Sequence, residues 1–317
     1  MGGNYTKEKQ KKANREKQFF INDHSFFRTL KHYIKRKTGL EVMGIIKYRF
    51  LIMIAQLFAD SRKIVLKFGS KTLVDKEGRI NPEILEEFAA QVAELTKDGK
   101  QLIIVSSGAQ AAGLSTMHKW ARKKDIHYRQ ALCAVGQVEL MAAWGRAFGK
   151  FGLHIAQILL TQEDFGDSNR TLHMRNTLFT LVDEGIIPII NENDTVSVEE
   201  IKIGDNDTLG ALSSILWSAD LLVLFSDVDG LFTKNPKEFP DAELVEIVKD
   251  IGEIRKKVSI GSTNDFGTGG QATKISAAEK ALPYGITTII TNGDRPRALE
   301  SLASGKQKGT VFLAEKK

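Results

Sequence analysis

Cysteine is almost absent from this chain, and its scarcity excludes several kinds of site. The 317 residues contain one cysteine, Cys133, so neither an internal disulfide nor a zinc site built from cysteines can form. The six histidines are scattered and nowhere take the HExxH spacing of a helical metal site. The single cysteine fits a protein of a reducing compartment, and we expect the protein in the cytoplasm.

Uncharged apolar runs long enough to span a membrane are also missing. Residues 40–58 are apolar, but they contain Glu41, Lys47 and Arg49, which interrupt the run too often for a comfortable span. No small-residue cleavage site follows, so a secretory signal is not indicated. A helix lying at a membrane surface is an alternative for this stretch. The apolar content of 42% and the charged content of 26% are typical of a soluble globular protein.

Charge is divided unevenly along the chain. Of the 45 Lys and Arg residues, 13 lie in residues 1–60, against 5 of the 39 Asp and Glu residues. The rest of the chain is therefore close to neutral, and the net charge of +6 gives no reason to expect a nucleic-acid partner. We predict that residues 1–60 form a basic, partly apolar extension, poorly ordered or helical, and that residues 61–317 form one folded domain.

From Arg62 onwards, apolar runs typical of strands alternate with amphipathic stretches typical of helices. Expected strands are Lys63–Phe68, Gln101–Ser106, His154–Thr161, Ile186–Ile190, Leu221–Ser226, Thr287–Thr291 and Thr310–Leu313. One expected helix begins at Pro82, with Asn81 as its cap, and is ended by Gly99. The other expected helices cover Arg129–Lys150, Asn169–Glu184 with Ser168 as its cap, Ile275–Leu282 and Pro296–Ser304. This alternation predicts an α/β fold with a largely parallel sheet covered on both faces.

Polar residues crowd around one loop of this pattern. The strand near Ile190 runs into Asn191–Asp194, and Gly204–Asp207 precedes the next helix, so four carboxylates and three amides flank the loop. Ligands bind at the carboxyl ends of strands in open α/β sheets. Such residues also serve as caps and turns, but two clusters around one loop favour a bound cation, either a metal ion or an ammonium group.

Three further loops have the composition of anion sites. Lys67–Ser70 and Ser106–Ala109 each follow a strand, and Gly267–Lys274 leads into a helix with free backbone N–H groups and a lysine. None is a Walker A or GxGxxG sequence. The strand end Phe225–Thr233 could hold a nucleotide base or ribose. Lysines, anion loops and a carboxylate cluster together indicate phosphoryl transfer.

Residues 62–314 resemble the amino acid kinase family over their whole length. The segments that carry the resemblance are KFGS, SSGA, INEND, GDND, SDVDGLFT and GTGGQATK, in the order typical of the family. INEND together with GDND is most similar to the glutamate kinases of that family. The resemblance implies a three-layer αβα sandwich that uses ATP and Mg²⁺ to phosphorylate the γ-carboxylate of L-glutamate, the first step of proline biosynthesis. Alternatives are kinases of acetylglutamate, aspartate, carbamate or UMP, and a non-catalytic amino-acid sensor.

The same resemblance implies roles for particular residues. The catalytic residues would be Lys67, Asp207 and Lys274, and the residues that bind glutamate would be Ser107, Asp194 and Asn206. The residues that bind ATP would be Lys67, Ser226, Asp227, Thr268, Gly269, Gly270, Gln271, Ala272, Thr273 and Lys274. No residue is assigned to the metal.

The resemblance also implies partners, and it has two limits. It implies a homo-oligomer and functional coupling to glutamyl phosphate reductase. Many family members continue into a C-terminal PUA domain, which is not expected here. Residues 1–60 match nothing in the family pattern, and we expect a chain that starts near Met53 to be a complete kinase.

Overall fold

The chain divides into two compact units, Met1–Phe50 and Leu51–Lys317. The computed structural model describes residues 39–117, 125–197, 206–236, 238–258 and 270–315. In the first unit these include only the beginning of a helix, α3 (Gly39–Asp60), which continues into the second. Within the described ranges, no helix combines the length and the apolar character that a membrane crossing requires. The expected boundary between residues 60 and 61 stays a prediction.

The second unit is built on an eight-stranded sheet. Its strands, in the spatial order β3-β4-β2-β1-β5-β7-β8-β6, are β3 (Ile155–Leu160), β4 (Ile187–Glu192), β2 (Gln101–Ser106), β1 (Lys63–Phe68), β5 (Leu221–Ser226), β7 (Thr287–Asn292), β8 (Gly309–Phe312) and β6 (Ile247–Val248). All neighbouring pairs are parallel except β7 with β8. The expected largely parallel sheet is therefore confirmed.

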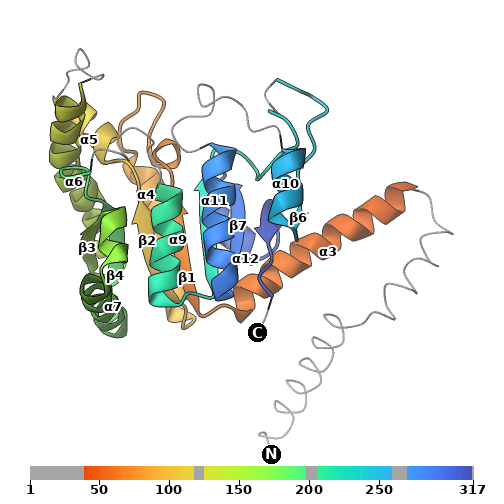
Figure 1. Cartoon of the computed structure of the whole chain (residues 1–317), viewed down its shortest axis with the longest axis horizontal. Coiled ribbons are helices and arrows are strands. Elements are labelled where there is room, and N and C mark those ends of the chain that lie inside the picture. Colours follow the sequence, from red (N-terminus) through yellow and green to blue (C-terminus); the bar gives the residue numbers. More distant parts are fainter. Residues whose placement is uncertain (1–38, 118–124, 198–205, 237, 259–269, 316–317) are drawn as a thin grey trace, which may run out of the picture. The chain divides into compact units, whose positions relative to one another are not determined.

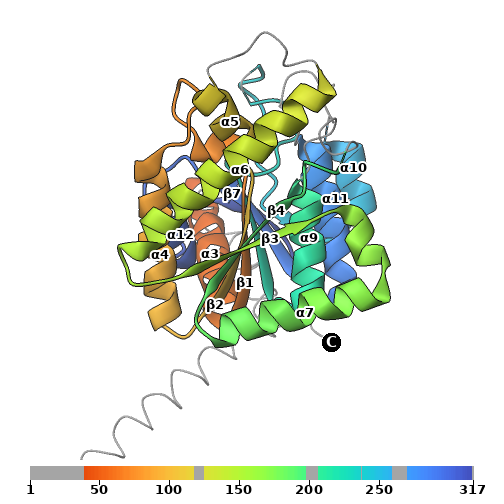
Figure 2. The same ribbon diagram turned by 90° about the vertical axis from the view of Figure 1, so that its left-hand side faces the viewer.

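Helices cover both faces of this sheet. They are α4 (Pro82–Lys97), α5 (Ala109–Met117), α6 (Ile126–Gly149), α7 (Ser168–Asp183), α9 (Asn206–Trp217), α10 (Ile251–Lys257), α11 (Gln271–Ala281) and α12 (Ala298–Ala303). Figure 1 shows α9 and α11 side by side over the sheet, and these two helices pack directly against each other. Figure 2, turned by 90°, places α4 and α12 on the opposite side of the sheet. The arrangement is the expected α/β sandwich.

Local sequence explains where the helices begin. Asn81 caps α4 by accepting hydrogen bonds from the backbone N–H groups of Glu83 and Ile84, and proline occupies the first helical position. The expected cap of α7 is wrong by one residue. Asp167, rather than Ser168, accepts from the backbone N–H groups at the helix start. Either side chain can cap a helix, so the pair Asp167-Ser168 did not define the boundary by itself.

Alternation along β1 decides which side chains reach which helices. Phe68 stacks on Phe225 with ring centroids 4.9 Å apart, and it contacts Phe88 of α4 at 4.5 Å. Val65 instead belongs to the core formed with α9 and α11. Because side chains in a strand alternate between faces, Lys67 lies on the same face as Val65. The lysine that begins the KFGS segment is thus directed towards α9 and α11.

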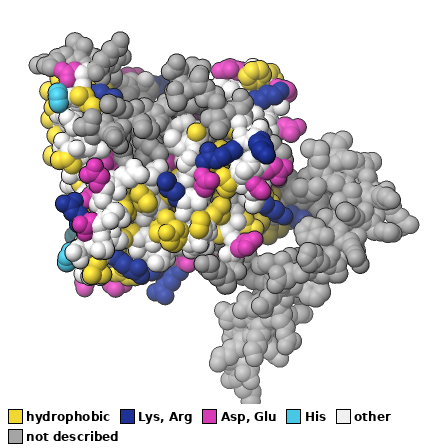
Figure 3. All heavy atoms as spheres, in the orientation of Figure 1, with side chains coloured by type: hydrophobic (Ala, Val, Ile, Leu, Met, Phe, Trp, Pro, Cys, Tyr) yellow, Lys and Arg dark blue, Asp and Glu magenta, His cyan; other side chains and the backbone are white. Residues whose placement is uncertain are grey.

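Charges of both signs share the surface over α9 and α11. In Figure 3, the basic and acidic side chains that are coloured on this face are interspersed with hydrophobic ones, without a continuous basic area. This distribution agrees with the near-neutral composition of the chain beyond residue 60.

Candidate active site

The predicted site residues of the described chain lie at the carboxyl ends of the central strands. Lys67 is near the end of β1, Ser107 follows β2, and Asp194 follows β4. Asn206 and Asp207 begin α9, and Lys274 lies in the first turn of α11. This edge is where α/β sheets bind their ligands, because strand ends and helix N-termini meet there.

A buried carboxylate between two lysines forms the centre of the site. Lys67 Nζ lies 2.6 Å from Asp207 Oδ1, and Lys274 Nζ lies 3.1 Å from Asp207 Oδ2. The three side chains are 6%, 1% and 8% exposed for Lys67, Asp207 and Lys274. Lys67 lies 140 positions before Asp207 in the sequence, and Lys274 lies 67 positions after it. The fold brings both lysines to one carboxylate, which holds the two ammonium groups in fixed places.

The two lysines keep Asp207 ionised. Burial raises the pKa of the Asp207 carboxyl, but the positive charges of Lys274 and Lys67 outweigh burial and hold the pKa well below its usual range. Thr273 adds to this effect by donating a hydrogen bond of 2.8 Å from Oγ1 to Asp207 Oδ2. Removing either lysine would leave a buried charge with less compensation, which is costly.

A chain of buried hydrogen bonds starts at the neighbouring residue. Asn206 Nδ2 donates to Ser107 Oγ and to Asn191 Oδ1, each at 2.8 Å. Asn191 Nδ2 in turn donates to Gln137 Oε1 at 2.8 Å. The chain joins α9, the start of α5, β4 and α6, so each polar side chain is oriented by the next.

Close packing of two helices fixes the loop that contains Ser107. Gly108 has φ +117°, which favours glycine, and α5 begins immediately after it. Where α5 crosses α6, a Cβ on Gly136 would overlap the carbonyl oxygen of Ala109 and the nitrogen of Gly113. Gly113 of α5 and Gly136 of α6 therefore allow the two helix backbones to touch, and this contact holds the first turn of α5 beside the site.

Asp194 lies beside the single cysteine. Burial raises the pKa of the Cys133 thiol, and the charge and hydrogen bond of Asp194 raise it further. Arg129 acts in the opposite direction but is the weakest influence. Burial and Asp194 thus both favour the neutral thiol of Cys133.

The predicted ATP-binding residues lie on the other side of the lysine pair. Ser226 ends β5, and Asp227 pairs with Lys71 at 3.3 Å. Gly270 precedes α11, and Gln271, Ala272 and Thr273 form its first turn with Lys274. Helix α11 starts at Gln271, four residues before the expected start at Ile275, because its polar first turn lacks the apolar periodicity that predicts a helix. Thr268 and Gly269 lie outside the described residues.

A resident metal site is not visible in the described ranges, where no three His, Cys, Asp or Glu side chains are grouped as ligands. Mg²⁺ usually keeps several water ligands and is held by one or two carboxylates together with substrate phosphates. The carboxylates of the described ranges therefore fit an ion that arrives with a nucleotide.

Sequence reasoning overlooked two members of the site. Asn191 was recognised only as part of the polar crowd, although it connects Asn206 to the rest of the chain of amides. Gln137 received no role, yet it is 8% exposed on α6 and accepts from Asn191. A glutamine on the otherwise apolar inner face of a helix was the available signal.

Known proteins match this chain along its folded body. A model of the amino acid kinase family matches residues 62–292. The glutamate 5-kinase of Alkaliphilus metalliredigens (strain QYMF) is 57% identical over 264 residues, which cover 83% of this chain and 100% of the relative. The glutamate 5-kinase of Geobacter metallireducens (strain ATCC 53774 / DSM 7210 / GS-15) is 44% identical, with 80% of this chain and 68% of the relative covered.

Solved structures show the same fold at lower identity. UMP kinase from Ureaplasma parvum superposes with a TM-score of 0.56 at 15% identity, covering 80% of this chain and 98% of that one. An isopentenyl phosphate kinase superposes with a TM-score of 0.54 at 17% identity, covering 79% and 99%. Because the family model matches residues 62–292 and the Alkaliphilus metalliredigens relative is 57% identical, this chain belongs to the amino acid kinase family.

Proposed function

We propose that this chain is a glutamate 5-kinase, which transfers the γ-phosphoryl group of ATP to the γ-carboxylate of L-glutamate and so begins proline biosynthesis. The observation that carries the proposal is the placement of Asp207, which is held between Lys67 and Lys274 directly beside the buried amides of Asn206 and Asn191. Positive charge suited to phosphate thus lies next to polar side chains suited to a small substrate.

The lysine pair suits phosphoryl transfer. In this reaction a γ-carboxylate oxygen of glutamate forms a bond to the γ-phosphorus as the bond to the ADP oxygen breaks, and charge spreads over the three equatorial oxygens. Lys67 and Lys274 would stabilise that charge, and Asp207 would orient them. The acceptor carboxylate is already ionised at neutral pH, so no side chain has to remove a proton from it.

The other side of the site suits a zwitterionic acid. We assign the ammonium group of glutamate to the carboxylate of Asp194, which lies half-buried after β4. We assign its carboxylate to Ser107 and Asn206, whose side chains are already joined at 2.8 Å at the start of α5. An acetylglutamate kinase would have no free ammonium group to place beside Asp194.

ATP would occupy the side of Ser226, Asp227 and residues 268–274. The helix N-terminus at Gly270 offers backbone N–H groups to phosphate oxygens. Mg²⁺, when bound with ATP, would neutralise part of the phosphate charge. A cytoplasmic location, a homo-oligomer and coupling to glutamyl phosphate reductase are further parts of the proposal that follow from the family resemblance alone.

An assay of ADP release against a panel of acceptors tests the proposal. The panel is L-glutamate, D-glutamate, N-acetyl-L-glutamate, L-aspartate, carbamate and UMP. We expect ADP release with L-glutamate and little with the others. Hydroxylamine in the reaction should trap the acyl phosphate as a hydroxamate in an amount equal to ADP, which separates phosphoryl transfer from simple ATP hydrolysis.

The Lys67→Met variant, checked for folding by circular dichroism, is the matched control because it should release no ADP above background. Preference for N-acetyl-L-glutamate, L-aspartate, carbamate or UMP would replace glutamate by that substrate. Binding of L-glutamate without ADP release by the unaltered chain would point to a sensor and overturn the proposal.

A further inference from the structure

Helix α6 begins against the two loops that are assigned to glutamate. Arg129, in the first turn of the helix, donates from Nε to Oε1 of Gln110 at 3.3 Å, and Gln110 lies in the first turn of α5, which packs on α6 (Figure 2). Gln130 donates from Nε2 to the carbonyl oxygens of Thr195 and Ser197, each at 3.4 Å, in the segment that follows β4. The start of α6 therefore joins the loop after β2 to the loop after β4.

The charges of Arg129 and Asp194 act on the same group. Arg129 precedes Cys133 by four residues, so the two side chains lie on one face of α6. Burial and then the charge of Asp194 raise the pKa of the Cys133 thiol, and the charge of Arg129 lowers it. The guanidinium of Arg129 thus lies on the side of α6 that faces Asp194 and the start of α5.

Most hydrogen-bond donors of Arg129 remain available to a ligand. The side chain is half-buried, and within the described part of the chain its one hydrogen bond runs from Nε to Gln110. A guanidinium has five N–H donors in a fixed plane, so the donors of Nη1 and Nη2 are left over. Paired N–H groups of this kind match the two oxygens of a carboxylate.

The donors already assigned to the α-carboxylate of glutamate are too few. Asn206 uses both hydrogens of its amide on Ser107 and Asn191, so its part is to hold Ser107 in place. The Ser107 hydroxyl has one hydrogen to donate, and backbone N–H groups at the start of α5 add to it. None of these groups carries a full positive charge. Glutamate bound beside Asp194 would therefore lack a cation at its α-carboxylate.

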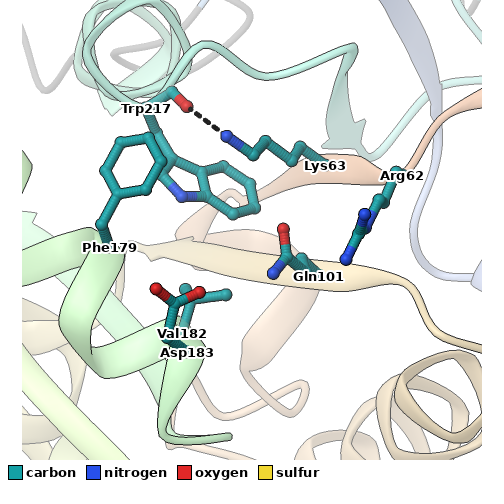
Figure 4. A pocket seen from close by; sticks show the side chains of 7 residues that line it. All are labelled: Arg62, Lys63, Gln101, Phe179, Val182, Asp183 and Trp217. Atoms are coloured by element: carbon teal, nitrogen blue, oxygen red, sulfur yellow. Dashed lines mark hydrogen bonds between the residues drawn. The ribbon is translucent and has the colours of Figure 1, made fainter.

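The lysines of β1 do not supply that cation. Lys67 is paired with Asp207 and is assigned to the transferring phosphoryl group. Lys63 begins β1, at the opposite end of the strand from the site. Figure 4 shows Lys63 there, with its Nζ bonded to the carbonyl oxygen of Trp217 at 3.4 Å. Arg129, in contrast, lies beside the loops that would contact glutamate.

We propose that Arg129 binds the α-carboxylate of L-glutamate through Nη1 and Nη2, and so makes the site selective for acids that carry this group. The inference rests on the proposed function and adds to it. Gln110 is a positioning residue, because it accepts from Nε and so fixes the plane of the guanidinium. Arg129 and Asp194 together then recognise the two charged groups on the α-carbon, while the γ-carboxylate faces the lysine pair.

Kinetics with L-glutamate and its α-amide test the proposal. The α-amide keeps the shape of the substrate but has no charge in place of the α-carboxylate, and its Ki as a competitor can be measured without turnover. Arg129→Gln should raise KM for L-glutamate at least about tenfold, as expected when a charged partner is lost. The same variant should change the Ki of the α-amide less than about threefold, and KM for ATP should stay as in the unaltered chain.

Three further variants accompany Arg129→Gln, and circular dichroism confirms folding in each. Arg146→Gln is the matched control, because it removes an exposed arginine of the same helix roughly 25 Å away at 1.5 Å per residue, and it should leave KM for L-glutamate unchanged. Arg129→Lys keeps the charge without the planar fork and should restore part of the affinity. Gln110→Leu keeps the cation but removes its acceptor, and should raise KM for L-glutamate by less than Arg129→Gln does. If Arg129→Gln does not fold, Arg129→Lys and Gln110→Leu are compared with L-glutamate and the α-amide in its place.

Equal losses of affinity for L-glutamate and the α-amide would assign Arg129 a structural role and overturn the proposal. An unchanged KM for L-glutamate in Arg129→Gln would overturn it too, as would a rise in KM for ATP of the same size.

The proposed function has a separate readout, which is ADP release by the unaltered chain with L-glutamate. Without ADP release, the proposed function fails, and isothermal titration of the unaltered chain and of Arg129→Gln with L-glutamate then decides about Arg129. Saturable binding that is at least about tenfold weaker in the variant would support the inference. Equal binding by both proteins, or no binding by the unaltered chain, would overturn it.

Discussion

Asn206 and Asp207 are neighbours in the first turn of α9, yet their side chains join two different networks. Asn206 donates to Ser107 and Asn191, whereas Asp207 accepts from Lys274 and Thr273 and pairs with Lys67. Successive residues of a helix point about 100° apart, so one helix start can serve two ligands. The GDND segment thereby separates a network suited to an amino acid from one suited to phosphate.

The lysine pair and its carboxylate should act as a unit. Lys67→Met, Lys274→Met and Asp207→Asn should each lower kcat by orders of magnitude, because removing one transition-state donor costs about 2.7–4 kcal/mol. The double variant of Lys67 and Lys274 should lose less than the product of the single losses. Steady-state kinetics on the purified variants measures both effects.

Stability must be followed in the same variants, since removing one member of a buried ion pair can cost about 3–5 kcal/mol of unfolding free energy. Asp241→Asn, which removes an exposed partner of Lys234, is the matched control and should leave kcat unchanged. A folded Asp207→Asn protein that keeps more than about a tenth of kcat would contradict the role given to Asp207.

Asp194 and the hydrogen-bonded side chains of Asn206, Asn191 and Gln137 should affect KM for glutamate more than KM for ATP. Asp194→Ala and Asn206→Ala should raise KM for glutamate strongly, because losing the partner of a buried charge costs about 2–5 kcal/mol. Gln137→Leu should have a smaller effect in the same direction, since it leaves Asn191 Nδ2 without its acceptor, at about 1–3 kcal/mol. A rise in KM for ATP as large as that for glutamate would refute this assignment.

Sequence periodicity was sufficient for most of the fold. The bounds of β1, β2 and β5 agree with expectation to the residue, because a strand buried on both faces is a short apolar run with sharp polar ends. The two-residue strand β6 has no such signal and was not expected. Within the site, motifs indicated Lys67 and Asp207, but Gln137 lies 54 positions from Asn191, and only tertiary packing brings them together.

The crossing of α5 and α6 gives a prediction about stability. Gly136→Ala should destabilise the protein by about 1–3 kcal/mol, because the new Cβ forces apart two helix backbones that touch. Gly149→Ala in the same helix is the matched control, since no atom lies within 4 Å of a Cβ there. It should be neutral or stabilising, by up to about 1 kcal/mol of helix propensity. Urea unfolding of both variants decides, and an equal response would contradict the close crossing.

The last prediction concerns residues 51–60, which the sequence assigned to the extension and which belong to the second compact unit. Ile54 and Phe58 of this segment are 0% and 1% exposed. Lys100 Nζ donates to the carbonyl oxygens of Phe58, Ala59 and Ser61 at 3.1, 2.6 and 2.6 Å, which satisfies the end of α3. Residues 51–60 thus pack within the second compact unit, Leu51–Lys317.

Truncation should therefore have two different results. A chain of residues 51–317, and also one that begins at Met53, should match the full chain in kcat, KM and melting temperature. A chain of residues 61–317 should lose several kcal/mol of stability, because burying Phe58 alone accounts for about 3–5 kcal/mol.

Two substitutions in the full chain provide the matched comparison, since Phe58→Ala should be destabilising and Ile52→Ala, at a position that is 50% exposed, should be close to neutral. If residues 61–317 melt at the same temperature as residues 51–317, the end of α3 contributes nothing and the boundary expected from the sequence is the better one. If activity survives the removal of residues 1–50 while salt-sensitive binding to anionic vesicles is lost, the basic extension has a localising role.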